Sequence, residues 1–294
     1  MLLKQYKTHF FETLKNIQEE QEIESFFFIL TEYLHNLKRV DVALNPNFEL
    51  LDAEVKKWDS ILAQLQQEKP IQYITGETWF YGLQFEVNEN TLIPRPETEE
   101  LVKWILDSQK LKDKSQKVEV LDIGTGSGCI PIALKANLSQ ANVSAIDVSE
   151  KALEVAKRNA QSNKVEINFI QANILEEEDL SKLPSSKIHH PSSYNIIVSN
   201  PPYVRNLEKQ EIKKNVLDYE PHLALFVEDT DALLFYRKIA ELAIKNLNPN
   251  GKLYFEINQY LGKETVVLLE NIGFKNIELR KDFYGNDRMI KCKK

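Results

Sequence analysis

The sequence has few of the residues that build disulfide frameworks and metal clusters. It contains only two cysteines, Cys129 and Cys292, and they are far apart along the chain. Such a pair indicates neither a disulfide framework nor a Cys-x-x-Cys site, and we expect no metal. A reducing cytoplasm is the simplest location for a chain with this cysteine usage.

Long hydrophobic runs and an excess of basic residues are also missing. Near the N-terminus the longest apolar run, Phe26–Leu30, has acidic neighbours and is too short for a membrane span or a signal-peptide core. Lysine and arginine number 37 against 44 acids, a net charge of −7. Because binding along a nucleic-acid backbone needs clustered bases, this balance disfavours direct nucleic-acid binding. No heptad repeat indicates a partner helix, so a monomer is the default expectation.

What the sequence does contain is a rigid polar corner, Asn200-Pro201-Pro202-Tyr203, directly after the apolar run Tyr194–Ser199. Each proline fixes its own φ and keeps the residue before it extended, so the loop is stiff before any ligand arrives. The Asn200 side-chain oxygen and the Pro201 carbonyl could accept both N–H groups of a planar amide or amine, and Tyr203 offers an aromatic face. An ordinary Pro-Pro turn is the alternative. All four are candidate catalytic and substrate-binding residues.

A second motif is a glycine loop that follows the apolar strand 118–123. It holds three of the nine glycines in five consecutive residues: Gly124, Thr125, Gly126, Ser127 and Gly128. Asp147 ends the next apolar strand, at a spacing suited to accept hydrogen bonds from ribose hydroxyls. The G-x-G-x-G spacing differs from the G-x-G-x-x-G of dinucleotide folds, which argues against a pyrophosphate. An adenosine-containing ligand without phosphates fits better, and S-adenosylmethionine is the usual one.

Strands and helices alternate from residue 118 onward. We expect strands at 118–123, 143–147, 167–171, 194–199, 252–257, 277–280 and 288–291, and helices from 130 and at 149–161, 232–247 and 262–271. This alternation predicts an α/β fold with a mostly parallel sheet and helices on both faces. Ligands bind at the carboxyl ends of such strands, which brings the glycine loop, Asp147, Asn173 and Asn200 to one edge.

The first seventy residues have a different pattern. Apolar residues recur there at intervals of three and four, which predicts a small helical bundle. Glycines and aromatics between Tyr73 and Ile93 predict a short β-hairpin, and Pro94–Glu97 leads into a helix that continues to about Leu106. We therefore divide the chain into a helical domain (1–70), a hairpin linker (71–94) and an α/β domain (95–294). His189 and His190, in a Pro/Ser-rich stretch, are assigned to a solvated loop.

The order of these motifs resembles a known family. The loop, the acid and the corner look like class I S-adenosylmethionine-dependent methyltransferases that methylate nitrogen, and segments 69–76, 80–82 and 92–99 resemble the peptide chain release factor glutamine methyltransferases. The resemblance implies a seven-stranded, doubly wound, Rossmann-like sheet whose final strand is antiparallel. It also implies S-adenosylmethionine as cofactor, contacts from Asn200, Asn173 and Ile174 to this cofactor, the last two at the adenine, and a place beside the active site for Arg95 and Glu97.

The same resemblance implies methyl transfer to the side-chain amide nitrogen (N5) of the glutamine in the Gly-Gly-Gln loop of bacterial class 1 peptide chain release factors 1 and 2, with the helical domain helping to hold this substrate. The first alternative is a methyltransferase of adenine or cytosine exocyclic amines, which uses nearly the same corner but must reach a base. The second is a catalytically silent cofactor-binding scaffold. A nicotinamide dehydrogenase disagrees with both the glycine spacing and the corner.

Overall fold

The computed structural model describes residues 1–109, 117–183, 191 and 193–294. The expected loop with His189 and His190 lies outside these residues. The chain forms two compact units, a helical unit (residues 1–76 and 213–219) and a sheet unit (the described residues of 77–212 and 220–294). No helix in the described ranges is both long and apolar enough to span a membrane.

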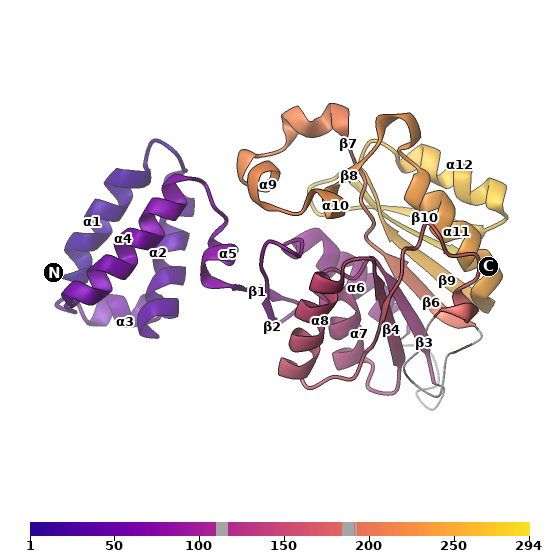
Figure 1. The fold of residues 1–294 in the computed structure, drawn as a ribbon, viewed down its shortest axis with the longest axis horizontal. Coiled ribbons are helices and arrows are strands. Elements are labelled where there is room, and N and C mark those ends of the chain that lie inside the picture. The colour runs from indigo at the N-terminus through magenta and orange to yellow at the C-terminus, as the bar shows by residue number, and fades with distance from the viewer. Residues whose placement is uncertain (110–116, 184–190, 192) are drawn as a thin grey trace. The chain divides into compact units, whose positions relative to one another are not determined.

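The helical unit confirms the predicted bundle (Figure 1). Its helices are α1 (Leu3–Leu14), α2 (Glu20–His35), α3 (Arg39–Leu44), α4 (Asp52–Gln66), α5 (Ile71–Thr75) and α9 (Lys214–Tyr219). Trp58 is fully buried among apolar and aromatic side chains, and its indole N–H donates to Nε2 of His35 at 3.0 Å. Burial lowers the pKa of His35, with Glu54 opposing the shift, so a neutral imidazole can accept this bond. This contact makes His35 part of the packing.

The sheet unit confirms the predicted seven-stranded sheet. Its order is β10-β11-β9-β6-β3-β4-β5, and only β11 runs antiparallel to the rest. The strands are β3 (Glu119–Ile123), β4 (Asn142–Asp147), β5 (Asn168–Gln171), β6 (Tyr194–Ser199), β9 (Leu247–Glu256), β10 (Lys275–Lys281) and β11 (Asp287–Lys293). In register, Ile123 pairs with Ser199, which pairs with Phe255. The carboxyl ends of these parallel strands therefore finish at one edge.

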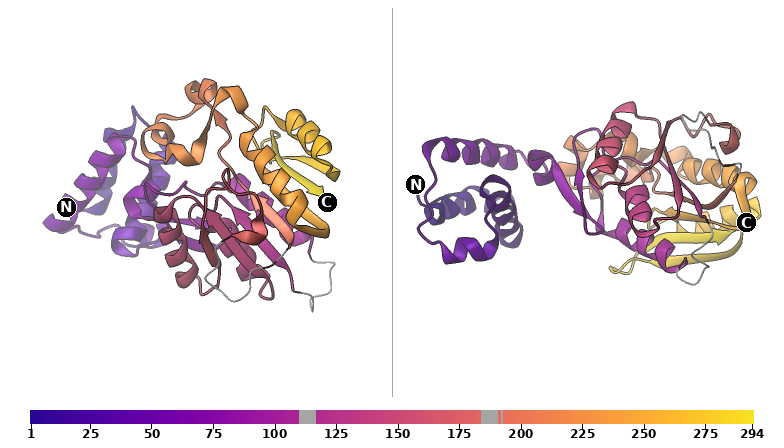
Figure 2. Two further views of the ribbon diagram at one scale, coloured as in Figure 1. Left: turned by 45° about the vertical axis from the view of Figure 1, so that its right-hand side comes forward. Right: turned by 90° about the horizontal axis from the view of Figure 1, so that it is seen from below.

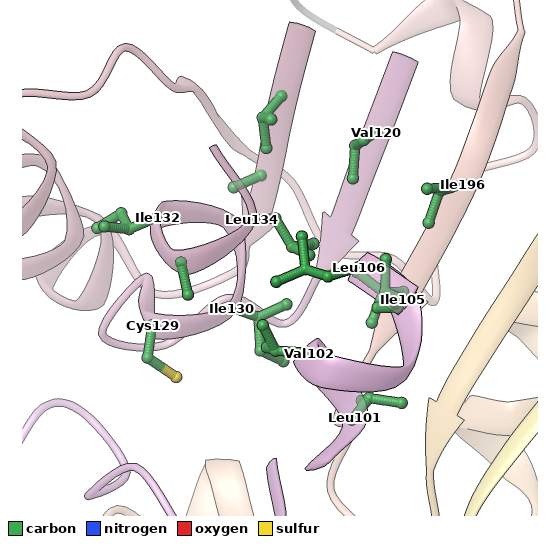
Figure 3. Close-up of a cluster of buried hydrophobic side chains, with 14 of the residues drawn as sticks. Leu101, Val102, Ile105, Leu106, Val120, Cys129, Ile130, Ile132, Leu134 and Ile196 are labelled. Carbon is green, nitrogen blue, oxygen red and sulfur yellow. The ribbon is translucent and has the colours of Figure 1, made fainter. Parts of the chain in front are cut away.

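Helices cover both faces of this sheet (Figures 1 and 2). They are α6 (Pro96–Asp107), α7 (Cys129–Asn137) and α8 (Glu150–Ser162) on one face, and α11 (Leu234–Asn246) and α12 (Gly262–Ile272) on the other. Successive residues of β3 alternate between the faces, with Val120 packing under α6 and α7 (Figure 3) and Leu121 on the opposite side. Each fully buried aliphatic side chain stabilises such a layer by about 1.5–3 kcal/mol.

The hairpin packs with the sheet unit. It consists of β1 (Glu77–Phe80) and β2 (Leu83–Glu86), and its Phe80 and Phe85 are buried against the α6–α8 face. The Glu86 N–H donates to Asn159, and the Glu86 carboxylate pairs with Arg158 of α8. The structural division thus follows Gly76, whereas the residue pattern predicts a helical domain at 1–70 and a separate linker at 71–94. The reason is that α5 buries Ile71 in the helical core, a contact that residue spacing does not show.

Short elements between β6 and α11 were not expected. These are β7 (Val204–Arg205), η2 (Asn206–Glu211), α10 (His222–Leu225), β8 (Phe226–Val227) and η3 (Asp229–Asp231), besides α9; a further 3-10 turn, η1 (Leu180–Lys182), precedes β6. Elements this short span too few residues for a hydrophobic period to be recognisable. Their positions are set by tertiary contacts, such as the parallel pairing of Val204 with Phe226.

Candidate active site

A cavity of about 370 Å³ lies in the sheet unit at the carboxyl edge of the sheet. Most of the predicted site residues line it: Gly124, Thr125, Gly126, Ser127, Asp147, Asn173, Ile174, Asn200, Pro201 and Pro202. They come from the ends of β3, β4, β5 and β6, as expected for a doubly wound sheet. Residues distant in sequence are thus brought together around one cavity large enough for a small ligand.

Asp147 is fixed by backbone groups at the end of β4. Its Oδ2 accepts from the Gly126 N–H at 2.8 Å, and its Oδ1 accepts from the Ser149 N–H at 2.9 Å. Burial raises the pKa of Asp147, while these backbone hydrogen bonds oppose the shift. The φ of +53° at Gly126 is the left-handed conformation that lets the loop turn its N–H to the acid. The hydrogen bond from Gly126 therefore holds the Asp147 carboxylate beside the cavity.

Asn173 sits in a turn after β5. Its Oδ1 accepts from the Leu175 N–H at 3.2 Å, and its Nδ2 donates to Glu176 at 2.8 Å. A carbonyl oxygen has two lone pairs, so Oδ1 retains one for a ligand amine. Ile174 is buried and adds an apolar wall.

The polar corner is braced from behind by two residues that the sequence analysis did not single out. Asn200 Nδ2 donates to Thr98 Oγ1 at 3.4 Å, and the Thr98 hydroxyl donates to Glu256 Oε2 at 2.6 Å. Glu256 ends β9 and is 1% exposed. The rule that parallel strands end at one edge of the sheet could have identified Glu256. Thr98 lies inside segment 92–99, one of the segments that resemble the glutamine methyltransferases.

Two of the predicted residues are placed differently from the others. Tyr203 is not among the described residues that line the cavity; its hydroxyl donates to Glu256 Oε1 at 3.2 Å. Gly128, also absent from that lining, is the N-cap residue that precedes α7, and a Cβ added there would lie 3.1 Å from Cβ of Ala156. Its role in this structure is the close packing of α7 against α8.

The segment before α6 contributes one wall of the cavity. Arg95 lines it and pairs with the buried carboxylate of Glu220, whose other oxygen accepts from the Ile93 N–H at 3.1 Å. Pro96 and two acids start α6, as predicted, whereas Glu97 is not among the described lining residues. Glu220 thus holds both the backbone at Ile93 and the guanidinium of Arg95 in place.

Asp122 is a further residue that the sequence analysis did not assign to the site. It lies beneath the glycine loop, is fully buried, and its two carboxylate oxygens have no hydrogen-bond partner of good geometry among the described residues. Burial raises the pKa of Asp122 to about 7, against the lowering effect of the Thr125 hydroxyl. Burial likewise raises the pKa of the neighbouring Cys129 thiol to about 12, which fits packing and not nucleophilic attack.

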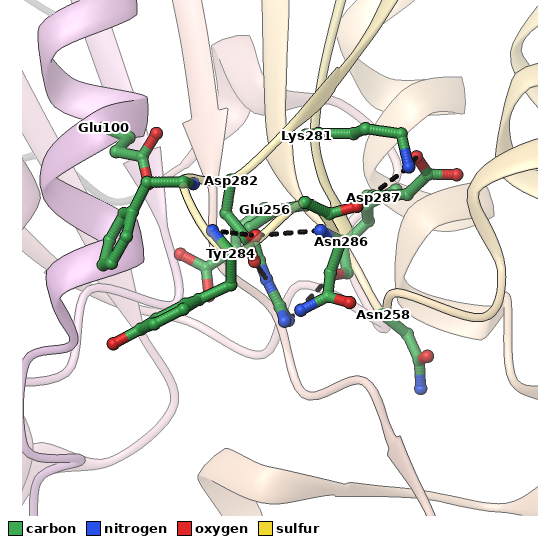
Figure 4. A network of polar contacts seen from close by, with 12 residues as sticks. Glu100, Glu256, Asn258, Lys281, Asp282, Tyr284, Asn286 and Asp287 are labelled. Carbon is green, nitrogen blue, oxygen red and sulfur yellow. Dashed lines mark hydrogen bonds and ion pairs between the residues drawn. The ribbon is translucent and has the colours of Figure 1, made fainter.

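A polar network surrounds the buried Asp282 in the turn between β10 and β11 (Figure 4). Asp282 accepts from the N–H groups of Tyr284 and Asn286 and pairs with Arg288, whose charge also lowers the pKa of Glu256 against the larger raising effect of burial. Within the described residues, no group of three or more His, Cys, Asp or Glu is placed to hold a metal ion.

Comparisons with known proteins agree with this architecture. Residues 6–76 match the PrmC N-terminal domain, and residues 105–222 match the methyltransferase small domain. A release factor glutamine methyltransferase of Flavobacterium psychrophilum is 62% identical, covering 99% of both chains, and one of Bacteroides thetaiotaomicron is 39% identical, covering 95% of both. In fold, a methyltransferase of Pyrococcus furiosus is similar, with a TM-score of 0.50 at 19% identity over 80% of this chain and 98% of that one. The identity over nearly the full length shows that the chain belongs to the release factor glutamine methyltransferase family.

Proposed function

We propose that the sheet unit binds S-adenosylmethionine in the cavity and catalyses methyl transfer to the side-chain amide nitrogen, N5, of a glutamine in a peptide chain release factor. The observation that carries this proposal is the Asn200-Pro201 corner at the cavity. Among the hydrogen bonds of the described residues, none has Asn200 Oδ1 or the Pro201 carbonyl as its acceptor. Two acceptors on a stiff loop match the two N–H donors of a primary amide.

The cavity suits this cofactor. When bound, S-adenosylmethionine supplies an electrophilic methyl group on a sulfonium. The Asp147 carboxylate suits the ribose hydroxyls, and Asn173 and Ile174 suit the adenine. Glycines at 124 and 126 leave no side chain between the loop backbone and a ligand in the cavity, so a close approach is possible.

The chain's own contribution to the reaction is to prepare the nucleophile. An amide nitrogen is weakly nucleophilic because its lone pair is delocalised into the carbonyl. Accepting both N–H groups at Asn200 Oδ1 and the Pro201 carbonyl raises electron density on the nitrogen and stabilises the positive charge that develops there. The same two bonds orient the nitrogen, and such orientation can contribute about 7–11 kcal/mol.

The proposed substrate is the glutamine of the Gly-Gly-Gln loop in release factors 1 and 2. Relatives that are 62% and 39% identical are named release factor glutamine methyltransferase, which supports this choice of substrate. A base-modifying activity is not favoured, since those relatives carry the glutamine methyltransferase name and the net charge is −7. The helical unit is proposed to help hold the protein substrate.

Transfer of radiolabelled methyl from S-adenosylmethionine tests the proposal. A purified bacterial release factor, its variant with the Gly-Gly-Gln glutamine replaced, and bulk DNA and RNA serve as parallel acceptors. Label on the intact factor alone is the expected result. Label on nucleic acid would replace the proposal with base methylation, and label on the glutamine variant would show a different acceptor residue.

A further inference from the structure

The Asn200 side chain can perform its proposed task in only one of its two amide orientations. The oxygen must face the substrate, because both hydrogens of the substrate amide need acceptors. If the Asn200 amide were turned by 180°, its NH2 would face the substrate NH2, and donor would meet donor. Something in the protein must therefore distinguish the two ends of this amide.

A chain of hydrogen bonds from Glu256 makes that distinction. Ionised Glu256 can only accept, and its Oε2 takes the single hydroxyl proton of Thr98 at 2.6 Å. Because the Thr98 hydroxyl donates its only proton to Glu256, Thr98 Oγ1 can act only as an acceptor toward Asn200. It accepts a hydrogen bond from Asn200 Nδ2 at 3.4 Å. Because the amide is planar, Oδ1 then faces away from Thr98.

Two side chains of this hydrogen-bond chain, Glu256 and Thr98, are buried. Glu256 is 1% exposed and Thr98 is 2% exposed, so water cannot substitute for either partner. Burial, together with the charge of Glu97, raises the pKa of Glu256, whereas the Thr98 hydrogen bond, the charge of Arg288 and the Tyr203 hydrogen bond oppose the shift and favour the acceptor state. In a low-dielectric interior, reversing one bond of the chain leaves a buried group unpaired.

The same carboxylate also holds the far end of the corner. Its Oε1 accepts from the Tyr203 hydroxyl at 3.2 Å, while the Tyr203 carbonyl accepts from Asn258 Nδ2 at 2.9 Å. Both ends of the four-residue corner, Asn200 and Tyr203, thus depend on one buried acid at the end of β9.

We propose that Glu256 is a positioning residue that sets the orientation of the Asn200 amide through Thr98, and that Tyr203 acts in the same brace. This inference rests on the proposed function. Thr98 lines the cavity, whereas Glu256 is not among the described lining residues. In this scheme both act by determining which atom of the Asn200 amide faces the substrate.

The first test compares Thr98→Val, which keeps the shape and removes the hydroxyl, with Thr98→Ser, which keeps the hydroxyl. We expect Thr98→Val to lower kcat for glutamine methylation at least about tenfold and Thr98→Ser to restore most of it. The dissociation constant for S-adenosylmethionine, measured by calorimetry, should stay within about twofold in both. An unchanged kcat in Thr98→Val would overturn the inference.

A double-mutant cycle separates orientation from general packing. If Thr98 acts only through the Asn200 amide, Thr98→Val should have little further effect in an Asn200→Ala background. Likewise Glu256→Gln, whose amide must turn a donor toward one of the two hydroxyls, should lower kcat alone and lower it by less in the Thr98→Val background, where only its contact with Tyr203 is left to lose. Fully additive losses in either cycle would overturn the inference. Wild-type enzyme that labels no glutamine acceptor would instead refute the proposed function, so the two failures are distinguishable.

Discussion

Asn200 is the residue on which the proposed chemistry depends most directly. Its side chain lines the cavity, and its Oδ1 is one of the two proposed acceptors for the substrate amide. A hydrogen bond that matters mainly in the transition state should affect turnover and not binding.

We expect Asn200→Ala to lower kcat by about 100- to 1,000-fold, the usual cost of removing one preorganised hydrogen-bonding group at a developing charge. The dissociation constant for S-adenosylmethionine should change far less, since several other residues line the cavity. Single-turnover methylation and calorimetric titration measure the two quantities. Equal losses in both would assign Asn200 to cofactor binding alone.

Asp122 predicts a pH dependence of stability in the protein without cofactor. Its pKa is about 7 when folded, against an ordinary value of 3.8, so folding favours the protonated acid. The free energy of unfolding should therefore fall as the pH rises from about 4 through about 7. Asp122→Asn removes this pH-dependent loss. At pH 8 its free energy of unfolding should exceed that of wild type by a few kcal/mol, at about 1.4 kcal/mol per pKa unit.

Urea unfolding at pH 5 and pH 8 measures this difference. The exposed acid Asp218 supplies a control, because Asp218→Asn should leave the pH dependence as it is in wild type. Parallel pH profiles for wild type and Asp122→Asn would show that the buried acid does not titrate in this range.

At the scale of elements, the start of α7 determines how closely two helices approach. Gly128 has a φ of +82°, and an added Cβ would lie 3.0 Å from Cδ1 of Ile132 and 3.1 Å from Cβ of Ala156. Both contacts are tighter than ordinary packing distances. The glycine therefore combines a left-handed turn with close packing between α7 and α8.

Gly128→Ala should lower the free energy of unfolding by more than the roughly 1–3 kcal/mol of backbone strain alone. Gly285→Ala is the matched control, since Gly285 has a φ of +88° and nothing within 4 Å of an added Cβ. Denaturant unfolding of both variants gives the comparison. Equal losses would mean that the contacts with Ile132 and Ala156 relax at no cost.

At the scale of the whole molecule, the cavity and the helical core lie in different units. Every residue that lines the cavity belongs to the sheet unit, whereas the helical unit has its own core around Trp58. Cofactor binding should therefore not require a stable helical unit.

Trp58→Ala should destabilise the helical unit by about 3–5 kcal/mol. We expect the dissociation constant for S-adenosylmethionine to stay near that of wild type, while KM for the release factor rises, because this unit is proposed to hold the substrate. Leu51→Ala, at a side chain that is 70% exposed, is the control. Thermal unfolding, calorimetry and steady-state methylation measure these quantities. A cofactor affinity that falls with Trp58→Ala would contradict the division.

The sequence by itself determined the sheet, its strands and ten of the residues that line the cavity. Those features depend on local patterns: apolar runs become buried strands, a left-handed loop requires glycine, and two prolines stiffen a corner. The rule that parallel strands end at one edge then brought Asp147, Asn173 and Asn200 together without any knowledge of contacts.

Only the tertiary structure decided what stands behind the corner. Thr98 and Glu256 are 158 positions apart in the chain, and the hydrogen bond between them exists because α6 packs across the end of β9. The same kind of packing directed the Tyr203 hydroxyl to Glu256, placed Gly128 under α8 and assigned residues 213–219 to the helical unit. Such contacts depend on three-dimensional packing between distant segments, and no local periodicity or motif encodes them.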